Sequence, residues 1–142
     1  MSIQSSAERR SLSQGSIYIL GLMAAISMSS ASAGIQSNTI DPAVEVSENG
    51  RHLRVTGPIA CITGQRAEIQ VTLTQRATGA IATGKSHFTC TGYLQQWEVH
   101  AVNQGREDFE TGAATAVAVG ITSTRGKPDD AHQWLVQVTL VH

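Results

Sequence analysis

The stretch Val44-Glu-Val-Ser-Glu-Asn-Gly-Arg-His-Leu-Arg-Val55 decides the fold class. Apolar and polar residues alternate on both sides of Asn49-Gly50, as in two half-buried β-strands. Asn-Gly between such runs is the strongest short-range hairpin signal, because both central turn positions need positive φ. Centring the turn there sets a register, in which all the facing pairs are favourable: Val46 with Leu53, Val44 with Val55, Glu48 with Arg51, and Glu45 with Arg54.

The alternation continues along the rest of the chain. It predicts strands over 67–75, 85–91, 94–102, 113–124 and 131–141, a short polar segment at 106–110, and turns or loops at 77–84, 103–105 and 125–130. Short strands at regular spacing are typical of all-β sandwiches and barrels. We therefore expect an all-β domain over residues 44–142, an antiparallel immunoglobulin-like β-sandwich of seven to eight strands. Residues 34–43 are expected to be a flexible N-terminal segment.

Two tryptophans lie on faces that the alternation turns inward. Trp97 shares its face with Val99 and Ala101, and Trp134 shares its face with Val136 and Val138. Large aromatic side chains at such positions contribute strongly to a small core. We expect both to be buried in the core and not to form an exposed platform for ligand stacking.

Residues 1–33 differ from the rest of the chain. Arg9 and Arg10 precede an apolar run over 17–28, and Ala31-Ser-Ala33 stands just before Gly34. These are the three parts of a secretory signal peptide, and the run is shorter than the roughly 20 residues that span a bilayer. We expect a signal-peptide helix cleaved after Ala33 and a secreted, extracellular domain. The arginine pair leaves both Sec and twin-arginine export open.

The chain contains two cysteines, Cys61 and Cys90. In an exported protein such a pair predicts a disulfide, with free thiols or a metal pair as the alternatives. Closing a loop of about 30 residues would stabilise the fold by roughly 3–4 kcal/mol. Thr-Gly follows each cysteine closely, at 63–64 and at 91–92, so both cysteines are expected late in a strand, just before a turn.

The charge of the expected mature domain is close to neutral. The 11 acidic and 10 basic residues of the chain become 10 and 8 without Glu8, Arg9 and Arg10, which gives a net charge of −2. No run of basic residues follows Gly34. Nucleic-acid binding by phosphate neutralisation and binding to a membrane surface are therefore not expected.

No motif for catalysis or metal binding is present in the expected domain. No serine lies in a Gly-x-Ser-x-Gly turn, and both cysteines are expected to be oxidised. The histidines lack zinc-site spacing: His52, His87, His100, His132 and His142. Acidic residues cluster at 107–110 and 129–130, but neither stretch matches a calcium-loop pattern. We expect no enzyme, no metal and no cofactor.

Several spaced residues carry a resemblance to known proteins: Cys61-x-x-Gly64, Val71-Thr-Leu-Thr-Gln75, Cys90-x-Gly92, Gln96-Trp97-x-Val99, Phe109-x-x-Gly112-x-Ala114-x-Ala116, and Trp134. Over about residues 55–140 the chain resembles a group of small secreted actinobacterial domains of unknown function, which implies no functional residue. It is also faintly similar to neocarzinostatin-type apoproteins, exported immunoglobulin-like sandwiches that hold a small chromophore. Those proteins carry two disulfides, whereas this chain can form one.

Three functions are compatible with these features. The favoured function is a monomeric, non-enzymatic binding module for an unknown extracellular protein, glycan or small molecule, with loops 76–86, 103–110 and 125–130 as the recognition surface. The second is a carrier of a small apolar ligand in a cleft. Its candidate site is the small-residue face of one strand: Ala114, Ala116, Ala118 and Gly120. The third is an extracellular enzyme, which no motif in the sequence supports.

Overall fold

A computed structural model describes residues 34–142 of the chain, with the exception of residue 36. The predicted signal peptide, residues 1–33, lies outside the described residues. The described part is built from strands: β2 (Ser37–Asn38), β3 (Ala43–Val46), β4 (His52–Ala60), β5 (Arg66–Gln75), β6 (Ala80–Thr89), β7 (Gln95–Asn103), β8 (Gly112–Thr124) and β9 (Lys127–Val141).

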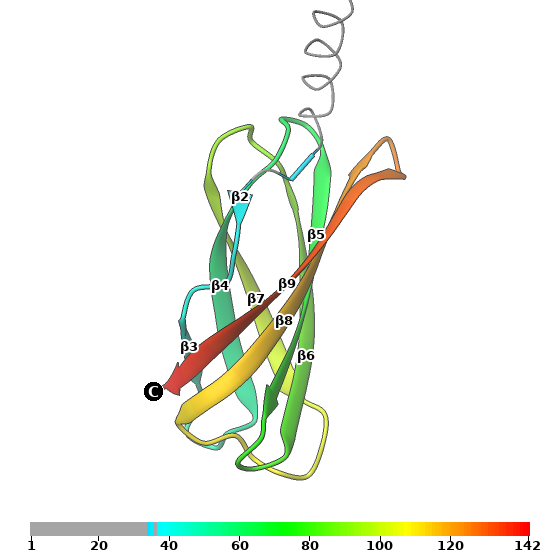
Figure 1. Ribbon diagram of the computed structural model, residues 1–142. Coiled ribbons are helices and arrows are strands. Elements are labelled where there is room, and N and C mark those ends of the chain that lie inside the picture. The colour runs from blue at the N-terminus through cyan, green and yellow to red at the C-terminus, as the bar shows by residue number, and fades with distance from the viewer. Residues whose placement is uncertain (1–33, 36) are drawn as a thin grey trace, which may run out of the picture. The chain divides into compact units, whose positions relative to one another are not determined.

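Seven of these strands close into a barrel (Figure 1). The order around the barrel is β4-β3-β9-β8-β5-β6-β7, and β7 pairs with β4 to complete the circle. The β3–β9 pair is parallel, and the other neighbours are antiparallel. The short strand β2 is added to β4, outside the closed circle.

The barrel corrects the prediction of an immunoglobulin-like sandwich, which was wrong. A sandwich needs two separate sheets, but here β4 pairs with β7 from His52↔Val102 to Ile59↔Gln95. On the other side β3 joins β9, so no gap divides the strands into two sheets. Alternating inward and outward residues are the same in both architectures, so the sequence pattern could not separate them.

The first hairpin has the predicted register. Glu45 pairs with Arg54 and Val46 with Leu53, and the Glu45 carboxylate lies 3.5 Å from the Arg54 guanidinium. The alternation therefore directs the valine and leucine side chains inward, where Val46 and Leu53 are buried.

The turn of this hairpin differs from the prediction. Gly50 has a positive φ of 71°, but Asn49 does not. Instead the Asn49 side chain accepts hydrogen bonds from Ser47 Oγ at 2.6 Å and from the Arg51 amide at 3.0 Å. Arg51 pairs with Asp108, which is 57 residues further along the chain, and not with Glu48. A long-range contact thus replaces the local ion pair that the sequence predicts.

Inward-facing side chains fill the barrel. The alternation along β5 is confirmed, since Ala67, Ile69, Val71 and Leu73 are all buried. Trp97 is also buried, as predicted, and has the largest of the fully buried side chains. Trp134 is only partly buried and packs against the edge of the core.

Two strands are longer than predicted. The expected turn at 77–84 is confined to four residues, and β6 already begins at Ala80. The expected loop at 125–130 is a two-residue turn, in which Arg125 and Gly126 have φ of 53° and 84°. Both central φ values are positive, as in the tight turns that match the twist of a hairpin. As a result, β8 and β9 form one long ribbon, with a bulge opposite Thr122 and Ser123.

The N-terminal residues, expected to be a flexible segment, pack against the barrel in the structure. Ile35 and Ile40 are buried in the core. Between them, Ser37 and Asn38 pair with Ala60 and Ile59. The barrel therefore includes apolar side chains that precede the first predicted strand.

Candidate functional site

The two ends of the barrel are built differently, and the loops that follow β4 and β6 lie at the upper end in Figure 1. We call this the disulfide end and define it as the loops 61–65 and 90–94. The predicted bridge between Cys61 and Cys90 is confirmed, with a Cα–Cα distance of 5.4 Å. Both cysteines directly follow a strand, β4 and β6 respectively, as the Thr-Gly echo indicated.

Backbone hydrogen bonds reinforce the bridge at the disulfide end. The Gly64 amide donates to the Cys90 carbonyl at 3.0 Å, and the Gly92 amide donates to the Cys61 carbonyl at 3.1 Å. Gly92 has a φ of +87°, and a Cβ atom there would collide with Thr63 Oγ1. The residue must therefore be glycine for the two loops to approach this closely.

Three large apolar side chains stand in solvent on these clamped loops. Ile62 is 43% exposed, Tyr93 80% and Leu94 65%. Neither loop contains a charged residue. Exposed apolar residues scattered singly need no explanation, but here they sit on two loops that are joined covalently and by hydrogen bonds. The end thus presents an uncharged apolar surface on a rigid base.

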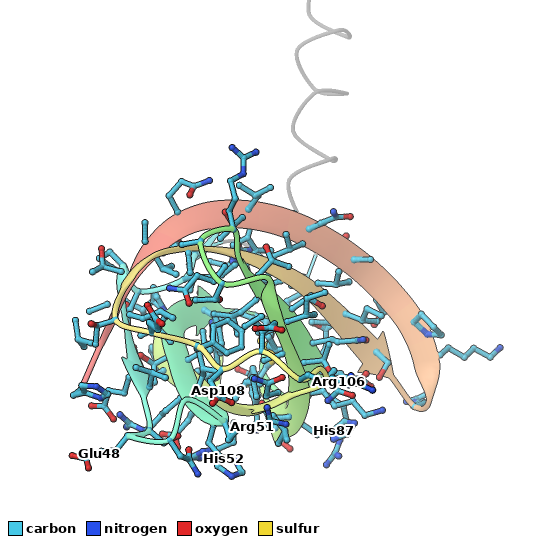
Figure 2. All side chains as sticks on the ribbon, turned by 90° about the horizontal axis from the view of Figure 1, so that it is seen from below. Glu48, Arg51, His52, His87, Arg106 and Asp108 are labelled. Carbon is cyan, nitrogen blue, oxygen red and sulfur yellow. A yellow bond between two sulfur atoms is a disulfide. The ribbon has the colours of Figure 1, made fainter. Side chains whose placement is uncertain are left out.

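The opposite end is closed by loop 104–111, and we call it the loop end. Phe109 is 4% exposed and plugs the barrel there. Its amide donates to the Gly50 carbonyl at 3.0 Å, and Asn103 Nδ2 donates to the Glu107 carbonyl at 2.6 Å. Figure 2 looks at this end from below and labels Arg51 and Asp108, whose side chains pair at 3.1 Å.

A pocket of about 700 Å³ opens beside this loop. Its lining combines the charged side chains of Arg76 and Glu110 with Gln137 and the small residues at the start of β8. Gln75 forms part of the wall and is held by Glu110 itself, since the Glu110 amide donates to Gln75 Oε1 at 2.9 Å. The pocket can therefore accept a small ligand with both polar and apolar parts.

The predicted ligand site on β8 faces the interior of the barrel. Ala116 and Ala118 are fully buried, and Ala114 both packs in the core and lines the pocket. A Cβ atom on Gly120 would lie 3.1 Å from the side chains of Ile69 and Trp134. Small residues on this face therefore leave room for neighbouring core side chains.

The loops predicted for recognition carry one exposed large apolar side chain, Ile81 at 46%, whereas the loops of the disulfide end carry three. Residues 80–86 belong to β6, 125–126 form a tight turn, and 103–110 are held down by the contacts described above. The exposed side chains of the disulfide end are not among the residues that the sequence pattern predicts for recognition. One available signal was the alternation in β7, because Leu94 has the outward parity of Gln96 and Glu98 opposite the buried Trp97.

Ionisable side chains form pairs and small networks on the outside of the barrel. Arg54 lies between Glu98 at 3.1 Å and Glu45 at 3.5 Å, and Glu98 also contacts His100 at 2.6 Å. The hydrogen bond from Arg54 lowers the pKa of the Glu98 carboxyl and raises the pKa of the Arg54 guanidinium. These contacts pair the four ionisable groups with one another.

The histidines are distributed over several strands. His87 pairs with Glu68 at 3.2 Å, His132 with Asp130 at 3.1 Å, and His142 contacts the Val46 carbonyl at 3.0 Å. Within the described residues, no three His, Cys, Asp or Glu side chains are grouped so that they could hold a metal ion. In the same part of the chain no helix is long and apolar enough to cross a membrane.

Comparisons with known proteins give no family. No family model matches the chain, and no curated protein matches it. Solved structures that match include a β-glucosidase from Erythrobacter marinus, at 13% sequence identity and a TM-score of 0.39. The match covers 76% of this chain and 15% of that enzyme. A likeness of this size carries no argument about function.

Proposed function

We propose that the protein is a non-enzymatic extracellular binding module that contacts its partner through the disulfide end. One observation carries the proposal: Ile62, Tyr93 and Leu94 are 43%, 80% and 65% exposed on loops joined by the Cys61–Cys90 bridge. Leaving such side chains in water is unfavourable, and burying each against a partner would recover roughly 1.5–3 kcal/mol.

The rigidity of the loops supports binding as strongly as their composition does. A preorganised loop loses little conformational freedom on association, so more of the burial energy is available for affinity. Tyrosine is among the residues that contribute most at the centres of interfaces. The two loops carry no charge, so they offer no group that could pair with a charge on the partner. We therefore expect the partner to be another protein with an apolar groove at the centre of the contact.

Paired variants test this proposal. The double substitution Tyr93→Ser and Leu94→Ser removes the apolar surface, whereas Leu135→Ser removes an equally exposed leucine, 61% exposed, from the outer face of β9. Each protein is immobilised and exposed to the extracellular fraction of the source organism, and the bound components are quantified by mass spectrometry. A component that binds the parent and the Leu135→Ser variant, but not the double variant, is expected.

Sedimentation velocity on the same proteins completes the test. If the parent forms a dimer that the double variant loses, the partner is a second copy of the chain. Identical bound components for the double variant and the parent would contradict the proposal, and so would the absence of any bound component. Circular dichroism confirms that each variant keeps its fold, as expected for substitutions at exposed positions.

The pocket beside loop 104–111 favours a second function, a small-molecule carrier. Ala113 is exposed and lines this pocket, so Ala113→Leu should fill it without disturbing the core. Native mass spectrometry on protein from the source organism's medium would show a non-covalent added mass that is lost on denaturation. That mass should be absent from the Ala113→Leu variant, and a bare polypeptide mass in both would exclude this function.

A further inference from the structure

Gly34, the residue after the expected cleavage site, lies in a buried polar site at the disulfide end. A Cβ atom on this residue would stand 2.6 Å from Thr122 Oγ1, 3.1 Å from Gln65 Oε1 and 3.4 Å from Asp130 Cβ. Gly34 is also the first residue of the compact unit that contains the barrel. Only a residue without a side chain fits here, so the position of the glycine is tightly constrained.

Two oxygen atoms beside Gly34 are buried and have no hydrogen-bond partner within the described residues: Thr122 Oγ1 and Gln65 Oε1. Thr122 is fully buried and Gln65 is 7% exposed. Buried polar atoms are nearly always paired in folded proteins, so an unpaired carbonyl oxygen and an unpaired hydroxyl around one residue need an explanation.

The orientation of the Gln65 amide is fixed by its other atom. Gln65 Nε2 donates to Asp129 Oδ2 at 2.8 Å and to Thr124 Oγ1 at 3.3 Å. Exchanging the oxygen and nitrogen would place the Gln65 oxygen against the Asp129 carboxylate. Two acceptors would then face each other, which is unfavourable. The carbonyl oxygen of Gln65 is therefore the atom next to Gly34, and it can only accept a hydrogen bond.

Asp130 supplies a carboxylate to the same site. Its Oδ2 accepts from the Ile35 amide at 3.2 Å and faces His132 Nε2 at 3.1 Å. The Ile35 amide lowers the pKa of this carboxyl below its usual value, so Asp130 is ionised at neutral pH. The surroundings of Gly34 thus contain one negative charge, one carbonyl oxygen that can only accept, and one unpaired hydroxyl that can accept or donate.

We propose that cleavage after Ala33 creates a donor that can serve all three side chains at once, and that the α-ammonium group of Gly34 binds in this site to the Asp130 carboxylate, Gln65 Oε1 and Thr122 Oγ1. The Ala33–Gly34 amide nitrogen carries one hydrogen, whereas the ammonium group carries three, one for each acceptor. The cleaved chain would therefore be held at its new terminus in a way that the uncleaved chain cannot be.

The cleavage itself is an ordinary hydrolysis by a peptidase of the export machinery. The C–N bond between Ala33 and Gly34 breaks, and one water molecule supplies a hydroxyl group to the carbonyl carbon and a hydrogen to the nitrogen. The carboxylic acid of Ala33 gives up its proton, and the amine of Gly34 takes up one. At neutral pH the amine is protonated, since an α-amino group has an ordinary pKa of about 7.7–8.0.

The test uses the full chain, expressed in an exporting bacterial host and purified after processing. Mass spectrometry should show a polypeptide that begins at Gly34. Its α-amine is then treated with an acylating reagent at pH 7, in the folded state and in denaturant. An ordinary α-amine reacts faster than lysine at this pH, but the bound ammonium should react about 10-fold more slowly in the folded state, because contact with the Asp130 carboxylate raises its pKa and leaves less free amine.

Three variants assign the effect to the site. Inserting one serine between Ala33 and Gly34 keeps the terminal charge but moves it out of the site, and it should restore fast acylation and lower Tm by about 5 °C. Asp130→Asn and Thr122→Val should act in the same direction. Glu68→Gln, which removes a carboxylate that pairs with His87 on the outside of the barrel, serves as the control and should leave acylation unchanged.

Two results would overturn the proposal. The first is a new terminus at any residue other than Gly34. The second is an α-amine that reacts equally fast in the folded and denatured states of the parent protein. Because acylation is read on folded protein, a variant that merely loses stability is recognised by its circular dichroism spectrum and does not count as support.

Discussion

The two ends of this barrel differ in what holds their loops in place and in where their apolar side chains point. At the disulfide end the backbone is clamped by a covalent bond, and the large apolar side chains of the loops point into solvent. At the loop end the described residues contain no disulfide, and the aromatic side chain of Phe109 points inward. The comparison teaches that cross-linking can free side chains from a structural role, whereas a loop without a cross-link must bury its own.

The largest expected effect contrasts one aromatic residue from each end. Phe109→Ala should lower the free energy of unfolding by about 3–5 kcal/mol, because it leaves a cavity inside the barrel at the loop end. Tyr93→Ala, at an 80% exposed position, should change it by about 0.5 kcal/mol or less. Urea unfolding measures both. Equal losses would mean that the two ends do not differ as described.

Removing the clamp should have the next largest effect. The double substitution Cys61→Ser and Cys90→Ser should cost about 3 kcal/mol in the free energy of unfolding, because the unfolded chain gains freedom over the 29-residue separation. Hydrogen exchange at the Gly64 and Gly92 amides should rise while exchange at Phe109 stays slow. Unchanged exchange at both glycines would show that hydrogen bonds alone hold the disulfide end.

A smaller effect should follow from the hydrogen bonds of the loop end. Asn103→Ala leaves the Glu107 carbonyl without its donor, and we expect a loss of about 2 kcal/mol in urea unfolding. Gln104→Ala is the matched control, because Gln104 is exposed and its side chain, among the described residues, donates only to the Val102 carbonyl. If the two variants lose the same stability, the Asn103 side chain does not hold the loop.

The smallest effect should appear as a pH dependence near the disulfide end. The Ile35 amide lowers the pKa of Asp130 in the folded protein, so the ionised carboxylate stabilises the fold at neutral pH. This contribution is present above the pKa of an unfolded aspartate, about 3.9, and is lost as the pH falls through the lower folded value. Asp130→Asn should flatten the acid limb of a plot of stability against pH. A parent and variant with parallel acid limbs would contradict this.

Local features of the fold could be predicted from the sequence. The register of Glu45 with Arg54 follows from alternation and charge around a single turn, and the Cys61–Cys90 bridge is the one pairing that two cysteines allow. The inward face of β5 is equally clear, because its apolar residues occur strictly at every second position. Each of these features depends on residues that are close in sequence or on a single possible pairing.

Long-range features could not be predicted in the same way. Nothing in the alternation of β4 states that its neighbour will be β7, and this pairing separates a barrel from a sandwich. Gly84 belongs to the predicted turn at 77–84, yet it lies inside β6 in the structure. A glycine is needed there because the His100 backbone comes too close for a side chain. The outward position of Tyr93 likewise depends on the bridge, which frees its loop from packing.

The parallel pairing of β3 with β9 bears on when the chain can fold. Val46 and His142, which meet at this seam, are 96 positions apart. Contacts between such distant residues make a high contact order, and high contact order slows folding. The circle of strands cannot close until β9 has been synthesised, so the barrel is expected to form late and slowly compared with a fold made of local contacts.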